Sequence, residues 1–188
     1  MLPPSTHALA AALADDPFYR AVTVAAGGDE TLRLQLLAGY FQLAWDEAQA
    51  VGEVQTQGAD GAALWTLPNA DGAASHGAQR TAALQPLLGA QGFAAYQAIC
   101  EAMASQLPTE LESAWYLSIL GVHPDARGQG LAQRLLAPTL ARADAAGASC
   151  FLETFNPLSL PFYARMGFAA AGEFLEPVTQ RRYCLLVR

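Results

Sequence analysis

A glycine-containing loop between a buried strand and a helix limits the possible folds of this chain more than any other feature of its sequence. Residues 115–122 are almost entirely apolar and stop at His123-Pro124, which predicts a strand buried on both faces. A helical pattern follows over 128–146 and ends at Gly147, where glycine is the usual helix terminator. A second apolar segment, 149–155, comes next, and a right-handed crossover through the helix would make the two strands parallel neighbours.

The loop Arg127-Gly128-Gln129-Gly130-Leu131-Ala132 is a candidate anion site at the start of that helix. Backbone N–H groups in the first helical turn have no intrahelical acceptor, and the helix dipole favours negative charge there. Glycines at 128 and 130 let the backbone approach a pyrophosphate closely. The alternative is that they only form a tight turn between strand and helix. Two nucleotide loops are disfavoured, because no G-x-x-x-x-G-K-[ST] occurs and a dinucleotide loop would need a glycine near Arg134.

The remaining pattern predicts an α/β chain with a mixed sheet flanked by helices. No linker-like tract divides the sequence, so we expect one domain over residues 1–188. Apolar spacings of three and four predict helices, and short apolar or alternating runs bounded by turn residues predict strands. The expected helices are 5–13, 30–52, 79–106 (broken near Gly89 and Gly92) and 157–166, and the expected strands are 53–57, 62–67, 168–174 and 182–187.

Composition narrows the classes of function. A formal net charge of −7 argues against nucleic-acid binding, which depends on clustered Lys and Arg, and is compatible with small cationic ligands. Three separated cysteines and three scattered histidines offer no zinc or disulfide pattern, so we expect no metal site. No apolar run reaches the roughly 20 residues that span a bilayer, and residues 1–4 lack a basic start, so a cytoplasmic location is expected.

Three side chains are expected beside the loop, near the carboxyl end of the second strand. Asn156 precedes Pro157, Tyr163 lies on the following helix, and Glu153 is a carboxylate within the strand. Ligands of open α/β sheets sit outside these strand ends. Asn156 could equally be only a helix cap, and Tyr163 could be a core aromatic. Glu153 is paired, solvent-facing, or raised in pKa and available as a base.

Together these residues resemble the GNAT family of N-acetyltransferases. The resemblance rests on Val122 ahead of the R-x-x-G-x-A of 127–132, then a strand, Asn156, and Tyr163 before Gly167-Phe168. Within that superfamily, the chain is similar to the puromycin N-acetyltransferase branch. The segments that carry this finer similarity are Ala114-Trp115-Tyr116-Leu117, Phe151-Leu152-Glu153-Thr154 and Leu160-Pro161-Phe162-Tyr163, together with the proline in the helix after the loop.

The resemblance implies acetyl-CoA as cofactor, inserted between the strands that end at Val122 and Thr154. The residues that it implies for cofactor binding are Leu120, Val122, Arg127, Gly128, Gln129, Gly130, Leu131, Ala132, Asn156 and Tyr163. It also implies Tyr163 as general acid to the leaving thiolate. The family's usual first strand should precede the helix at 5–13, and we expect it to be missing, truncated or supplied otherwise. Many members carry an acidic base on the strand before the loop, whereas 115–122 contains none, which leaves Glu153, a more distant carboxylate or a water chain.

The expected activity is therefore direct attack by a primary amine of a small molecule on the acetyl group, in a ternary complex. The aromatic residues Tyr40, Phe41, Trp45 and Tyr116 are candidates for the acceptor pocket, with Trp45 and Tyr116 preferred as substrate contacts. An open sheet edge would favour a homodimer. The alternative function is a non-catalytic acyl-CoA-binding or ligand-sensing protein that keeps the fold, and the missing acidic base favours that alternative slightly.

Overall fold

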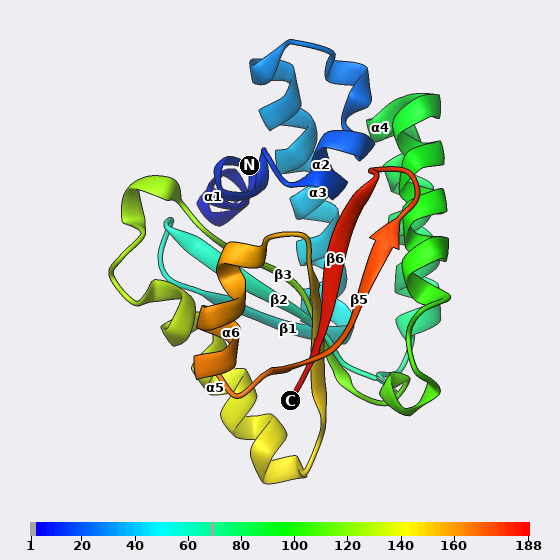
Figure 1. Ribbon diagram of the computed structural model, residues 1–188. Helices are drawn as coiled ribbons and strands as arrows, with labels where there is room; N and C mark the ends of the chain where they lie inside the picture. The colour runs from blue at the N-terminus through cyan, green and yellow to red at the C-terminus, as the bar shows by residue number, and fades with distance from the viewer. Residues whose placement is uncertain (1–2, 69) are drawn as a thin grey trace.

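The computed structural model describes residues 3–68 and 70–188 and contains a six-stranded mixed sheet in the order β1-β2-β3-β4-β6-β5 (Figure 1). Every neighbouring pair is antiparallel except β3 and β4, which are parallel. This confirms the predicted crossover from the first buried strand, through a helix, to the second. The strands are β1 Gly52–Thr56, β2 Gly61–Thr66, β3 Trp115–Val122, β4 Cys150–Thr154, β5 Ala169–Glu176 and β6 Arg181–Val187.

Helices cover both faces of the sheet, because the side chains of its central strands alternate between two cores. On β2, Ala62 and Leu64 pack in the core shared with helices α1 and α3, while Ala63 and Trp65 pack against α5 and α6 on the other face. That alternation is the period of two expected of a strand. The helices are α1 Pro4–Leu13, α2 Pro17–Val22, α3 Glu30–Val51, α4 Ala73–Ala104, α5 Leu131–Ala146 and α6 Leu160–Arg165.

Helices α2 and α4 differ most from the sequence prediction. Helix α2 occupies Pro17–Val22, where no helix was predicted, because Asp16 caps it by accepting a hydrogen bond from the N–H of Phe18 and Pro17 stands at its first turn. Helix α4 begins at Ala73, earlier than expected. The break foreseen within it is real, since Gly89 has a φ of 68°, a left-handed value that glycine adopts without steric cost.

Strand β1 forms one edge of the sheet. Within residues 3–68, the chain enters through α1, and β1 pairs with β2 alone. The outer edge of β1 therefore has no partner strand in the described part of the chain. Among the described residues, no helix combines the length and apolar character needed to cross a membrane.

Candidate functional site

The glycine loop is built as an open cradle of backbone N–H groups. Gly128 and Gly130 have φ values of 79° and 72°, which L-residues with a side chain rarely adopt. A Cβ atom built on Gly128 would meet no other atom within 4 Å, so the space next to the backbone at this residue is open. The first helical hydrogen bond runs from the N–H of Arg134 to the carbonyl of Gly130. In the described chain, no carbonyl accepts from the N–H groups of 128–133, which leaves these donors for an anion.

A cavity of about 490 Å³ opens beside this cradle and is lined by the loop and by α6. Helix α5 starts at Leu131 rather than at Gly128 as predicted, because Gly130 is in the left-handed conformation and caps it. Arg127 and Arg165 border the cavity, and exposed Arg134 folds back to donate to the carbonyl of Gln129. The loop is thus a local concentration of positive charge in an acidic chain, which suits a phosphate ligand.

Strands β3 and β4 separate soon after they begin to pair. Their parallel register includes only Trp115 with Cys150 and Tyr116 with Phe151. Beyond Tyr116, β3 continues to Val122 against β2 on its other side. The edge of β3 that faces β4 therefore has no partner strand from residue 117 onward in the described chain. An extended ligand with amide groups could use that edge, as a further strand would.

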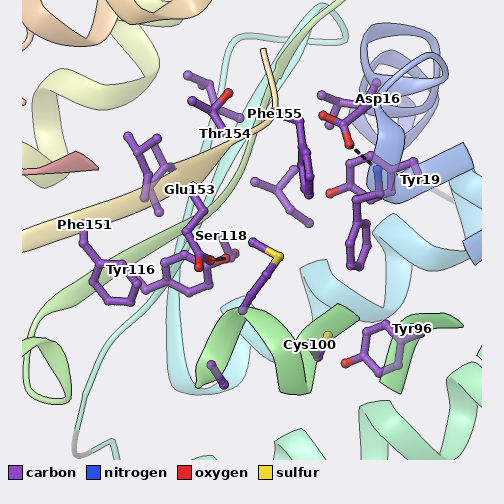
Figure 2. A pocket seen from close by; sticks show the side chains of 18 of the residues that line it. Asp16, Tyr19, Tyr96, Cys100, Tyr116, Ser118, Phe151, Glu153, Thr154 and Phe155 are labelled. Atoms are coloured by element: carbon purple, nitrogen blue, oxygen red, sulfur yellow. Dashed lines mark hydrogen bonds between the residues drawn. The ribbon is translucent and has the colours of Figure 1, made fainter. Parts of the chain in front are cut away.

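A second cavity, of about 430 Å³, extends from this separation toward helices α2 and α4. Its walls include the residues of β3 from 116 to 120 and those of β4 from 151 to 154. Val122, two residues further along β3, already lines the cavity at the glycine loop. The two cavities thus follow each other along β3, and Figure 2 shows the larger part of the second one from close by.

Glu153 lies in this second cavity and is held by Tyr116. The Tyr116 hydroxyl donates a hydrogen bond to Oε2 of Glu153 (3.1 Å), drawn as a dashed line in Figure 2. Burial raises the pKa of Glu153 above its usual value, and the hydrogen bond from Tyr116 partly offsets that rise. The Tyr116 ring stacks on Phe151 with centroids 4.6 Å apart. The sequence analysis left three interpretations of Glu153 open. In the structure, its carboxylate is paired with the phenol of Tyr116 and its pKa is raised.

Tyr163 borders the same cavity from α6. Its side chain is 8% exposed, and its ring makes edge-to-face contacts with Phe162 and Phe168. Burial raises the pKa of the phenol to about 12, so the hydroxyl stays protonated at neutral pH. It makes no hydrogen bond with any described residue, although it reaches the cavity wall. Tyr163 is therefore a core aromatic whose hydroxyl has no partner among the described residues, and its contact with a ligand stays a prediction.

Asn156 acts as a helix cap in this structure. Its side-chain oxygen accepts from the N–H of Leu158 (3.0 Å), at the start of a 3₁₀ turn that leads into α6. The residue is exposed, and its NH2 group donates to no described residue. The cap fixes the direction in which the chain leaves β4, so Asn156 can serve the loop and still offer a donor to a ligand.

The structure does not bring all the predicted pocket aromatics together. Tyr40 and Tyr116 line the cavity beside β3. Trp45 does not. Its side chain is 8% exposed and packs in the core between α3 and the sheet, as does Phe41, which is fully buried. The assignment of Trp45 as a substrate contact is corrected here, because its side chain packs in the core and not in the cavity.

Sequence reasoning missed the polar groups that α2 and α4 bring to this cavity. Asp16 and Tyr19 reach it from the start of α2, and Arg80 from α4. Arg80 pairs with Glu47 (2.8 Å) and also donates to the hydroxyl of Tyr40 (3.0 Å). The signal available for Asp16 was Asp-Pro before an aromatic pair, which is a cap motif. No spacing in the sequence indicates that this cap faces a cavity.

Comparisons with known proteins agree with the fold and the loop. Residues 88–170 match the family model described as acetyltransferase (GNAT) domain. A solved structure of histone acetyltransferase HPA2 and related acetyltransferase from Corynebacterium glutamicum has 23% identity and a TM-score of 0.63, covering 97% of this chain and 87% of that chain. Arylalkylamine N-acetyltransferase 2 from Aedes aegypti has 15% identity and a TM-score of 0.61, covering 98% and 91%. For two other matched acetyltransferase structures, the chain spans 49% and 56% of their length.

Proposed function

Because this protein has the GNAT fold and its residues 88–170 carry the acetyltransferase (GNAT) domain, we propose that it transfers an acetyl group from acetyl-CoA to a primary amine of a small molecule. The observation that carries the proposal is the separation of β3 from β4 after two residue pairs. It leaves a strand edge that leads from the glycine loop into the cavity that contains Glu153. Similarity to the puromycin N-acetyltransferase branch remains a prediction.

The residues present fit acetyl-CoA in three places. The N–H groups of 128–133 and the side chain of Arg127 would hold the pyrophosphate. Backbone groups of Leu120 and Val122 on the open edge of β3 would pair with the amides of the pantetheine arm, and the NH2 group of Asn156 would donate to the same arm. Acetyl-CoA, when bound, supplies a thioester whose carbonyl carbon accepts the amine. The acetyl group would then lie at the mouth of the cavity that contains Glu153 and Tyr163.

The roles of the two titratable residues follow from their protonation. Glu153 would take a proton from the ammonium group of the acceptor, which leaves the neutral amine that attacks, and its raised pKa brings it closer to neutral pH, where a general base works best. Tyr163, which stays protonated, would give its proton to the thiolate as the carbon–sulfur bond breaks. A new C–N bond replaces the C–S bond, and the second proton that the nitrogen loses as the amide forms would return to the Tyr163 phenolate, so that Glu153 holds the one net proton that the reaction releases.

The experiment that tests this function measures thiol release from acetyl-CoA with a panel of small amines, alongside calorimetry of acetyl-CoA binding. We expect thiol release that depends on particular amines. Glu153→Gln should lower kcat by about 10²- to 10⁴-fold with acetyl-CoA affinity kept, because the amide preserves the size of the side chain but accepts no proton at neutral pH. Acetyl-CoA binding without release for any amine would support a sensor instead, and no binding would refute the cofactor site.

A matched control separates chemistry from folding. Asp125 is exposed and lies between β3 and the glycine loop, near the cofactor cradle and away from the cavity that holds Glu153. Asp125→Asn makes the same carboxylate-to-amide change as Glu153→Gln, and it should leave kcat near the wild-type value. Equal losses in the two variants would argue against a specific role for Glu153.

A further inference from the structure

Asp16 is a carboxylate without a cation partner among the described residues, and it lines the second cavity, beside β3 and β4, which we call the acceptor cavity. Its Oδ1 accepts from the N–H of Phe18 (2.9 Å), and that bond caps α2. The backbone N–H of Tyr19 is a second donor to the carboxyl and, like that of Phe18, lowers its pKa, but no cation among the described residues pairs with Asp16. Burial raises the pKa of this carboxyl to about 6, which records the cost of keeping a charge there without a cation. The adjacent acid, Asp15, is exposed and paired with Arg20.

A second group beside Asp16 has no partner either. The side chain of Tyr19 is 8% exposed, yet its hydroxyl makes no hydrogen bond with a described residue and reaches the cavity. Figure 2 shows this hydroxyl pointing inward from α2, close to Asp16 and facing Phe155. A buried phenol normally finds a partner. A carboxylate oxygen, a phenol oxygen and aromatic walls together match the donors and the charge of an ammonium group.

The acceptor cavity carries net negative charge, because the arginine that lines it is already neutralised by an ion pair. Arg80 is the cation that lines it, and Arg80 is already bound to Glu47. Asp16 and Glu153 remain, on opposite walls: Glu153 on β4 beside Tyr116, and Asp16 across the cavity at the start of α2 (Figure 2). An acceptor with one ammonium group would leave one of these carboxylates without a cation. An acceptor with two positive charges would satisfy both.

We propose that the acceptor is a compact dication, such as a linear diamine, whose reacting nitrogen lies at Glu153 and whose second ammonium group binds Asp16 and the hydroxyl of Tyr19. This inference rests on the proposed function for the site at Glu153. Asp16 would be a specificity-determining residue, because it contacts the end of the substrate that does not react. The distance between the two carboxylates would then select the length of the diamine.

The test compares linear α,ω-diamines of increasing chain length with n-alkylamines of matched length in the thiol-release assay. We expect kcat/KM to favour diamines and to peak at one chain length. Asp16→Asn should lower the ratio of diamine to monoamine kcat/KM by roughly 10- to 100-fold, the usual effect of losing a hydrogen bond to a charged partner. Asparagine caps helices as well as aspartate does, so the variant keeps α2. Asp15→Asn is the matched control and should leave the ratio unchanged.

A second variant and a binding measurement test the site for the second ammonium group independently of Asp16→Asn turnover. Tyr19→Phe removes only the hydroxyl and should lower the same ratio by a smaller factor. Calorimetry of the preferred diamine with the chain saturated with CoA should show binding that Asp16→Asn weakens, whether or not transfer occurs. Equal kcat/KM for diamines and monoamines, with no change in Asp16→Asn, would overturn the dication proposal while leaving the transferase standing. Acetyl-CoA binding without any transfer would instead refute the proposed function.

Discussion

Removing Arg80 should destabilise the protein through the acid that it leaves behind. Arg80 and Glu47 are 2.8 Å apart, with side chains 17% and 15% exposed. Taking one partner from a fully buried pair costs about 3–5 kcal/mol, because the remaining charge has no counterion. Since both side chains keep some contact with water, we expect Arg80→Met to lose about 2–4 kcal/mol of unfolding free energy. Tyr40 loses a hydrogen bond as well, because Arg80 donates to its hydroxyl.

Urea unfolding of single and double variants measures this effect. We expect Arg80→Met/Glu47→Met to be more stable than Arg80→Met alone, because the double change leaves no buried charge and fills the space with apolar atoms. Tyr40→Phe isolates the smaller contribution of one hydrogen bond, about 1 kcal/mol. The reasoning is refuted if Arg80→Met costs less than about 1 kcal/mol, or if the losses of the two single variants simply add in the double variant.

Three further predictions concern the loop, the base and the sheet. Gly128→Ala should weaken acetyl-CoA binding by about tenfold or more in calorimetry. It should cost only about 1–2 kcal/mol of unfolding free energy, because the added Cβ meets no protein atom although the φ of this residue is strained for alanine. Unchanged affinity for acetyl-CoA would refute the role of the loop as a pyrophosphate cradle. Tyr116→Phe removes a hydrogen bond that favours the charged form of Glu153, so the pKa of Glu153 should rise further. The acid limb of the pH profile of kcat/KM should then move to higher pH. An acid limb that does not move would exclude Glu153 as the general base. Gly52→Ala places a Cβ atom 1.9 Å from the carbonyl oxygen of Trp65 and should cost roughly 3 kcal/mol or more in urea unfolding.

The second half of the chain was predictable because its signals are local. The bounds of β3 agree with the expected strand, and the glycine loop follows because left-handed φ values at 128 and 130 require glycine. Gly147 ends α5 in the left-handed conformation, as its position indicated. Each of these features depends on the backbone preferences of a few neighbouring residues.

The acceptor cavity was less predictable because it depends on contacts between distant segments. The sequence predicts only a helix cap at Asp16, and the packing of α2 against α4 brings it to the cavity that Glu153 also lines. Trp45 shows the opposite error, since an aromatic residue on an amphipathic helix gives the same pattern whether it faces a core or a cavity. The bond between Tyr116 and Glu153 joins residues 37 apart, and no periodicity within either strand indicates that pairing.

The separation of β3 from β4 also bears on the sequence of events in one turnover. The acceptor cavity shares its wall at β3 with the edge along which acetyl-CoA would lie. Without acetyl-CoA, the cavity that an amine would enter is open along that wall. Cofactor entry would complete it, so acetyl-CoA should bind first and CoA should leave last. Initial-rate patterns with CoA as product inhibitor should then be competitive against acetyl-CoA and noncompetitive against the amine.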